Sequence, residues 1–215
     1  MDYTIITSCN RKPQVEALVQ SIQQVFTGKI IVFDDGSEQV PEVDCEVIHY
    51  KTRHGKRGYY KLITDVFQFL KRNNFERFWL IPDDVTISQD LFTTSALLWS
   101  AIKDERKICL SVAHSHDRHL QPCWTYFKPI VLGEVVLTNW NDLFFMAERQ
   151  FLEELNYEIE KPYSDYDYRS SGVGRYISRT LHNKSWNMYH VNKSLANFID
   201  IETQMHKPCQ NNIAP

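Results

Sequence analysis

Short apolar runs alternate with amphipathic segments along the first 90 residues. The runs are rich in β-branched and aromatic residues and lie at 3–8, 29–33, 46–50 and 78–82. Such runs are typical of strands that are buried in a parallel sheet. Between them, apolar residues recur with the helical period from Pro13 to the residues before Gly28, and again over about 59–72. This alternation predicts parallel strands joined by helical crossovers.

The pattern of the second half is more mixed. We expect helices at about 91–102, 148–155 and 173–182, and strands at 108–113, 131–137 and 142–146. The whole pattern predicts a single α/β domain with a Rossmann-like, mixed and mainly parallel sheet flanked by helices. Residues 206–215 have no periodic pattern and are expected to be a tail or a linker.

Composition excludes several classes of protein. The net charge of -3 gives no basic field that would attract nucleic acid, and the apolar stretches are too short to span a bilayer. Residues 1–3 show no basic segment typical of a secretory signal. The five cysteines are scattered without a CxxC pair, which favours reduced thiols in the cytoplasm.

Two adjacent acids, Asp83 and Asp84, follow the buried run at 78–82. Open α/β sheets bind ligands at the carboxyl ends of their strands. Adjacent carboxylates raise each other's pKa unless a cation lies between them, and Mg²⁺ and Mn²⁺ prefer such oxygen ligands. The pair therefore indicates a metal site, although two solvated acids in a turn are the alternative interpretation.

Polar residues also follow the first two strands, at Asn10-Arg11 and at 34–37 (Asp-Asp-Gly-Ser). Parallel topology should bring these groups to the same edge of the sheet as Asp83 and Asp84. Asp-Gly is also a common turn signal. The chain has neither GxGxxG after its first strand nor GxxxxGK[ST], which disfavours dinucleotide oxidoreductases and P-loop enzymes.

With these motifs the sequence resembles the GT-A fold glycosyltransferases, in particular the inverting, family-2-like group. The likeness rests on the segment 5–11, on the xDDGS-like segment 33–37 and on the segment 80–84 at the place of the DxD metal motif. A further likeness is to glycosyltransferase domains encoded by large chlorella viruses. The resemblance implies one domain at 1–205, with a nucleotide-sugar half at about 1–90 and an acceptor half at about 91–205.

One position departs from the family pattern, because Pro82 stands where DxD has its first acid. We therefore assign Asp84 as the main ligand of Mn²⁺ or Mg²⁺, and Asp83 as a contact to ribose, sugar or a metal-bound water. One carboxylate and a diphosphate make a weak cage, so metal binding should depend on the nucleotide.

The resemblance also implies which other residues bind the nucleotide sugar. The expected contacts are Thr7, Asn10, Arg11, Asp34, Asp35, Arg57 and Lys61. The acid of the xDDGS segment is expected to receive the base N–H. Arg57 follows a glycine-containing loop and precedes a helix, so it can reach a diphosphate, with Lys56 and Lys61 as alternatives.

Inversion requires a general base that removes the proton of the acceptor hydroxyl. Asp165 and Asp167 are equal candidates on an alternating segment, and Asp142 is the third. Trp124, Tyr126 and Trp140 are expected to stack on the acceptor sugar, although core packing is their commoner role.

The late segment 193–197 resembles a family segment whose His often completes the metal site. Asn197 replaces that His here, which puts a third protein ligand in doubt. His190 and His206 are possible substitutes, but a lone His is more often a packed or surface residue.

The resemblance thus implies a hexosyltransferase that moves a sugar from a nucleoside-diphosphate sugar, UDP-sugar foremost, to a carbohydrate hydroxyl. It is expected in the cytoplasm, that of a host cell if the protein is viral. Two alternatives stay open. A sugar-phosphate nucleotidyltransferase shares this half-sheet, but its glycine-rich basic loop after the first strand is missing. A non-catalytic carbohydrate-binding module with a degenerate pocket would explain the missing acid and His.

Overall fold

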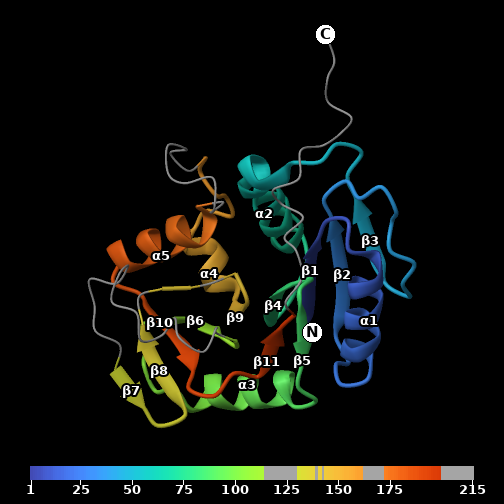
Figure 1. Ribbon diagram of the computed structural model, residues 1–215. Coiled ribbons are helices and arrows are strands. Elements are labelled where there is room, and N and C mark those ends of the chain that lie inside the picture. The colour runs from blue at the N-terminus through green and yellow to red at the C-terminus, as the bar shows by residue number, and fades with distance from the viewer. Residues whose placement is uncertain (114–129, 139, 142, 162–171, 200–215) are drawn as a thin grey trace.

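The computed structural model describes residues 1–113, 130–138, 140–141, 143–161 and 172–199. Within them, one nine-stranded sheet has helices on both faces, and a two-stranded sheet lies beside it (Figure 1). The strands are β1 Tyr3–Ser8, β2 Lys29–Asp34, β3 Glu46–His49, β4 Arg77–Pro82, β5 Val85–Ile87, β6 Lys107–Ser111, β7 Ile130–Leu132, β8 Val135–Thr138, β9 Phe145–Glu148, β10 Asn187–Val191 and β11 Ala196–Phe198. The helices are α1 Lys12–Gln23, α2 Gly55–Lys71, α3 Leu91–Ala101, α4 Arg149–Glu154 and α5 Val173–Asn183.

The large sheet has the strand order β3-β2-β1-β4-β9-β6-β10-β8-β7. The four strands from β3 to β4 pair in parallel, as the alternating pattern of the first 90 residues predicts. In the other half, β9 runs antiparallel to both of its neighbours, β4 and β6, while β10 pairs in parallel with β6. The predicted mixed, mainly parallel α/β sheet is confirmed.

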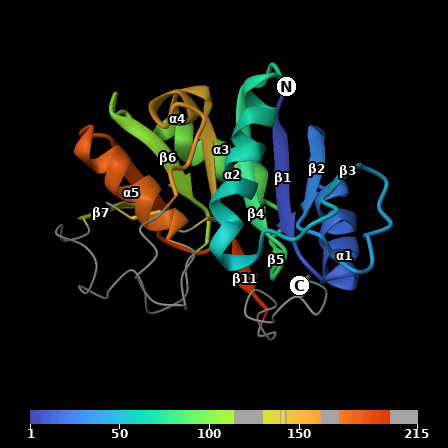
Figure 2. The same cartoon turned by 90° about the horizontal axis from the view of Figure 1, so that it is seen from above.

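Each face of the large sheet packs against its own set of helices. Helices α2, α4 and α5 share one apolar core with strand residues such as Ile5 and Phe78. Helices α1 and α3 share a second core on the opposite face with residues such as Ile6 and Trp79. Successive residues of a strand point to opposite faces of the sheet. Since both faces are covered by helices, the strand residues on both faces must be apolar, which explains the uninterrupted apolar runs. Figure 2 shows α2 lying over the sheet.

The structure corrects three of the predicted elements and adds strands that the pattern did not predict. The expected strand at 131–137 is a hairpin of β7 and β8 that turns at Gly133 and Glu134. The strand expected at 142–146 begins only at Phe145. Helix α2 begins at Gly55, four residues before the predicted start at 59. The late strands β10 and β11 were not predicted, although Met188, Tyr189 and Val191 are apolar residues in a segment of strand length.

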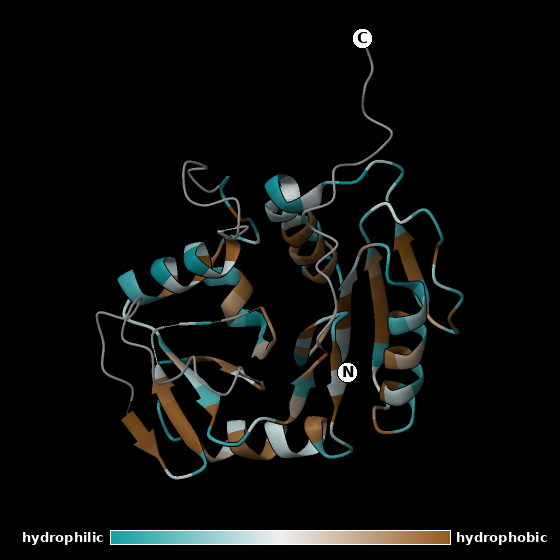
Figure 3. Ribbon diagram, in the orientation of Figure 1, coloured by the Kyte–Doolittle hydropathy of each residue, from teal (hydrophilic) through white to brown (hydrophobic). Residues whose placement is uncertain are grey.

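The hairpin leaves an apolar edge on the sheet. Ile130, Val131 and Leu132 of β7 are all exposed, and β7 is the last strand in the sheet order. It is drawn in brown in Figure 3. Among the described residues, no helix is both long and apolar enough to cross a membrane.

Phe78 lies at the centre of the core beneath α2 and α4. Its side chain is fully buried, and its ring centroid lies 5.8 Å from those of Phe75 and Phe145 and 6.0 Å from that of Phe151. We expect Phe78→Ala to lower the free energy of unfolding by about 3–5 kcal/mol, because it leaves a cavity among these rings. Leu97→Ala on α3 is the control. Leu97 is 72% exposed, so this substitution should change the free energy of unfolding by less than about 0.5 kcal/mol. Urea denaturation measures both, and equal losses would contradict this packing.

Candidate functional site

The carboxyl ends of four parallel strands lie side by side at one edge of the sheet. The register pairs Ser8 at the end of β1 with Asp34 at the end of β2, and Thr7 with Pro82 of β4. Asp34 pairs in turn with His49 at the end of β3. The polar residues after these strands therefore converge, as the sequence predicts.

Asp83 is the buried centre of this edge. Its carboxylate Oδ2 accepts hydrogen bonds from the Ser8 hydroxyl at 2.8 Å and from the Cys9 amide at 3.2 Å. Its Oδ1 lies 2.7 Å from Nη1 of Arg11. Burial raises the pKa of Asp83, and the charge of Arg11 is the largest contribution that opposes the shift. With both oxygens bonded inside the protein, Asp83 ties the end of β4 to the turn after β1.

Arg11 also contacts the second carboxylate of the pair. The same Nη1 atom lies 3.2 Å from Oδ2 of Asp84. Arg11 is 7% exposed, so its guanidinium is a buried cation between two acids. The negative charges of the two adjacent carboxylates are thereby partly balanced by the protein's own Arg11.

Asp84 is the more accessible carboxylate, with its side chain 35% exposed. Its backbone oxygen accepts a 2.8 Å hydrogen bond from the amide of Ile199, directly after β11. The late segment that contains Asn197 thus lies beside the aspartate pair, because β11 pairs with β5 and Asn197 faces Thr86 in the register. A ligand that approaches this edge meets the carboxylate of Asp84 before that of Asp83.

Asp34 anchors the turn that follows β2. Its fully buried carboxylate accepts hydrogen bonds from the hydroxyl and, at 3.2 Å, the amide of Ser37. The Nδ1 atom of His49 lies 2.6 Å from the same carboxylate. These bonds fix the Asp-Asp-Gly-Ser turn, whose Gly36 has φ of 68°, a conformation that favours glycine.

Asp35 connects the same turn to helix α2. Its carboxylate accepts hydrogen bonds from the backbone amides of His54 at 2.7 Å and Gly55 at 2.9 Å, and the His54 ring nitrogen Nδ1 lies 2.7 Å away. Free amides at a helix N-terminus are stabilised by such an anion. This contact, supplied by the turn after β2, explains why α2 begins at Gly55 despite the low helix propensity of glycine.

The turn after β1 is fastened to the turn after β2. Asn10, with φ of 53°, donates its backbone amide to the Ser37 hydroxyl at 2.6 Å and accepts a hydrogen bond from the Glu38 amide at 2.9 Å. Thr7 is buried beneath this turn, with its hydroxyl 3.1 Å from that of Tyr59. Asn10 is exposed at the edge, whereas Thr7 supports it from inside.

Arg57 and Lys61 lie on α2 and are both exposed. Arg57 is inside the first turn of the helix and does not precede it, which corrects the predicted placement. Neither cation is part of the hydrogen-bonded cluster around Asp83.

The predicted acceptor residues are largely outside the described part of the chain. This holds for the base candidates Asp142, Asp165 and Asp167 and for the aromatic residues Trp124 and Tyr126. Trp140 is described and half-buried between β8 and β9, with its amide 3.2 Å from the Thr138 hydroxyl.

Within the described ranges, no three side chains of His, Cys, Asp or Glu gather as a metal cage. His190 lies on β10, between β6 and β8 in the sheet, so it is separated from the aspartate strand by β9 and β6. His206 is outside the described residues. Of the residues that the structure describes, Asp84 and the internally bonded Asp83 are therefore the candidate metal donors at this edge.

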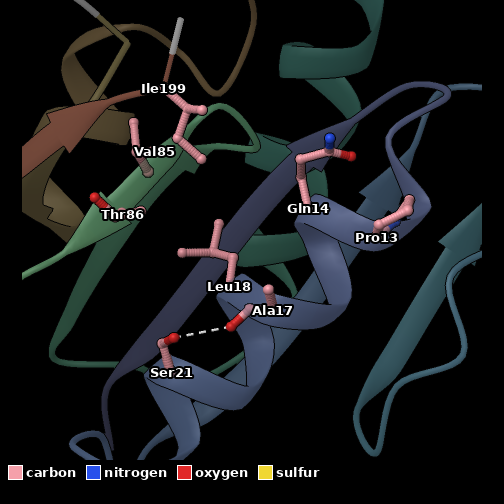
Figure 4. Close-up of a pocket in the computed structure, with 8 residues that line it drawn as sticks. All are labelled: Pro13, Gln14, Ala17, Leu18, Ser21, Val85, Thr86 and Ile199. Atoms are coloured by element: carbon pink, nitrogen blue, oxygen red, sulfur yellow. Dashed lines mark hydrogen bonds between the residues drawn. The ribbon is translucent and has the colours of Figure 1, made fainter. Parts of the chain in front are cut away.

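An apolar groove with a volume of about 310 Å³ lies between α1 and the two-stranded sheet (Figure 4). It is lined by Pro13, Gln14, Ala17, Leu18, Ser21, Val85, Thr86 and Ile199. Its polar groups are few, and the Ser21 hydroxyl is bonded to the Ala17 carbonyl. The groove and the carboxylate cluster therefore differ in chemistry, although Ile199 contacts both.

Several residues of the cluster were not predicted as site residues. Ser8, His49 and His54 hold Asp83, Asp34 and Asp35 in place. The position of His49 was available from the pattern, because it ends the third parallel strand at the same edge. The contact of His54 required the position of the helix start, which the pattern did not give.

Solved structures share this architecture, whereas comparisons of the sequence find no relative. No family model and no curated protein sequence matches the chain. Among solved structures, residues 1–349 of S. aureus TarS superpose with a TM-score of 0.62 at 10% identity, over 92% of this chain and 60% of that one. GalNAc-T7 with UDP, GalNAc and Mn²⁺ gives 0.66 at 12% identity, over 93% and 44%. The mannosyltransferase PcManGT from Pyrobaculum calidifontis, with GDP-Man and Mn²⁺, gives 0.57 at 12% identity, over 87% and 53%.

The chain has the GT-A fold. It spans about half the length of these three structures, 44% to 60%. At such low identity the likeness establishes the GT-A fold alone. The chemistry of the chain must therefore be argued from its own residues.

The turn at Gly36 allows a matched test of the site's backbone. A Cβ atom at Gly36 would lie 2.8 Å from the amide nitrogen of Arg53, whereas one at Gly133, with nearly the same φ, would meet nothing within 4 Å. Both alanine variants incur the left-handed strain of about 1–2 kcal/mol. We expect Gly36→Ala to lose at least about 1 kcal/mol more stability than Gly133→Ala in urea unfolding, because the backbone at Gly36 or at Arg53 must move to make room for the Cβ atom. Equal losses would contradict the close approach of the two segments.

Proposed function

We propose that the chain is a metal-dependent glycosyltransferase that moves a sugar from a nucleoside-diphosphate sugar, UDP-sugar foremost, to a carbohydrate hydroxyl with inversion. The observation that carries the proposal is the convergence of Asp83, Asp84, Arg11 and the turn at Asp34 and Asp35 at one edge of the sheet. An edge of this kind in an open α/β sheet is where ligands bind.

The GT-A neighbours support the proposal through their ligands. GalNAc-T7 holds UDP and Mn²⁺, and PcManGT holds GDP-Man and Mn²⁺. A nucleotide and a divalent ion therefore occur together on this fold in two proteins whose nucleotides differ, UDP in one and GDP in the other. Both nucleotides remain candidates here, and UDP is preferred because of the resemblance of the xDDGS-like turn.

The turn at 34–37 would bind the nucleoside. A carboxylate has several lone-pair positions, so Asp35 could accept a base N–H in addition to its internal bonds, while the fully buried Asp34 holds the turn in place. Asn10 and Arg11 stand between this turn and the aspartate pair. The exposed Arg57 and Lys61 of α2 would contact the diphosphate, and the buried Arg11 would attract it through its charge.

A hard divalent ion fits the donor set of the site. Asp84 would hold it, with the oxygens of the donor's diphosphate and water as further ligands, and Asp83 would keep Asp84 in place. When bound, the ion supplies positive charge that stabilises the leaving diphosphate. Among the described residues, Asp84 is the accessible carboxylate of the pair, which predicts that metal and nucleotide bind together.

The acceptor hydroxyl requires a base from the second half of the chain. Asp165 and Asp167 are the equal candidates and Asp142 is the third, all on segments adjacent to acceptor-side elements in the sequence. Trp140, and from the sequence Trp124 and Tyr126, are proposed to pack against the acceptor sugar.

Calorimetric titration of UDP with and without Mn²⁺ tests the donor site. The wild-type protein is expected to bind UDP only with Mn²⁺. Asp84→Ala should abolish turnover of the UDP-sugar and weaken this binding by about tenfold or more, because a charged ligand is lost. Asp44→Ala, which removes an exposed acid before β3, is the control and should bind as the wild type does.

Full Mn²⁺-dependent activity of Asp84→Ala would contradict the metal assignment. If UDP binds neither with nor without Mn²⁺, GDP and dTDP are titrated next. If these also fail, the glycosyltransferase proposal is wrong and a non-catalytic binding module replaces it.

The base is tested with Asp165→Asn and Asp167→Asn. One variant should lose sugar transfer by about 100-fold or more and still bind the donor, because removal of a general base affects only the chemical step. The other should transfer normally and serves as its control. Normal transfer by both would assign the base to another residue, with Asp142→Asn the next variant to assay.

A further inference from the structure

Arg11 occupies the position that a cation would take between the two aspartates. Its Nη1 atom lies 2.7 Å from Asp83 Oδ1 and 3.2 Å from Asp84 Oδ2, and the side chain is nearly inaccessible to solvent. A guanidinium keeps its charge at every pH that proteins encounter. The pair of acids therefore already has a permanent counter-ion.

The backbone holds Arg11 in this position. The residue is the N-cap of α1, and its carbonyl accepts the first helical hydrogen bond, from Val15 at 3.0 Å. On the opposite side, the Ser8 hydroxyl and the Cys9 amide fix the Asp83 carboxylate against which the guanidinium rests. The cation is thus part of the framework and is not a mobile surface charge.

The charges at the site determine what it can bind. Two carboxylates and one guanidinium leave a net charge of about -1, and a divalent ion beside Asp84 would lie within a few ångströms of the Arg11 charge. A diphosphate would add negative charge and would be attracted by both cations. Arg11 therefore lowers the affinity of the free site for a metal ion by itself, whereas a diphosphate adds the negative charge that favours a metal ion.

We propose that Arg11 is the built-in counter-ion of Asp83 and Asp84, and that it weakens the binding of divalent metal to the site until a diphosphate is present. The identity of the diphosphate as a nucleotide sugar rests on the proposed function. The effect of Arg11 on metal binding does not.

The test is calorimetric titration of Mn²⁺ alone, without nucleotide, into four proteins. The wild type should bind Mn²⁺ at about millimolar affinity or more weakly. Arg11→Met, which keeps an apolar stem and removes the charge, should bind Mn²⁺ about tenfold more tightly or better. The double variant Arg11→Met with Asp84→Asn should lose this gain, because the accessible carboxylate is gone.

Lys12→Met is the matched control. It removes the same charge one residue further along, but Lys12 pairs with Glu42 and Glu16 and does not contact the aspartates. Its Mn²⁺ affinity should stay within about twofold of the wild type. A gain as large as that of Arg11→Met would show an effect of net charge and would overturn the inference.

Removal of one partner of a buried ion pair destabilises a protein, so circular dichroism must confirm that Arg11→Met is folded. The wild-type titration needs no variant, and micromolar binding of Mn²⁺ alone would overturn the inference by itself. A folded Arg11→Met without a gain in affinity would do the same. UDP takes no part in these titrations, so failure of UDP to bind contradicts only the proposed function.

Discussion

The buried carboxylate of Asp83 is the interaction on which the candidate site depends. An isolated anion is very costly to bury, and this one is tolerated because a hydroxyl, a backbone amide and a guanidinium all bind to it. These partners come from the last residue of β1 and from the turn after it, whereas Asp83 follows β4. One carboxylate therefore fixes the relative position of two strand ends, and it orients Arg11 at the start of α1.

The same principle operates at the turn after β2, where two acids have different partners. Asp34 bonds within its own turn and to His49 of the neighbouring strand, and Asp35 binds the first amides of α2. The polar residues thus connect loops that the apolar core does not reach. The first half of the sheet consequently presents a rigid polar edge, and rigid elements position ligand-binding groups more accurately than free loops do.

The parallel half of the fold could be predicted because buried strands must be apolar on both faces, as at Ile5, Ile6, Phe78 and Trp79. The convergence of Asp34 and Asp83 followed from parallel topology alone. The hairpin at Gly133 was missed because apolar residues flank its turn on both sides, so the pattern resembles one strand. The start of α2 and the bond from Arg11 to Asp83 could not be predicted, because both depend on contacts between segments that are distant in the sequence.

Alternating exposure explains how two adjacent aspartates acquire different tasks. From Ile81 to Val85, buried residues alternate with partly exposed ones, so the chain keeps its strand-like period through the bend. Asp83 must then point into the protein, where only internal partners can compensate its charge. Asp84 must point towards the edge, where a ligand can reach it. Adjacent acids at the end of a buried strand are therefore not equivalent ligands, since the inner one provides structure and leaves the outer one for binding.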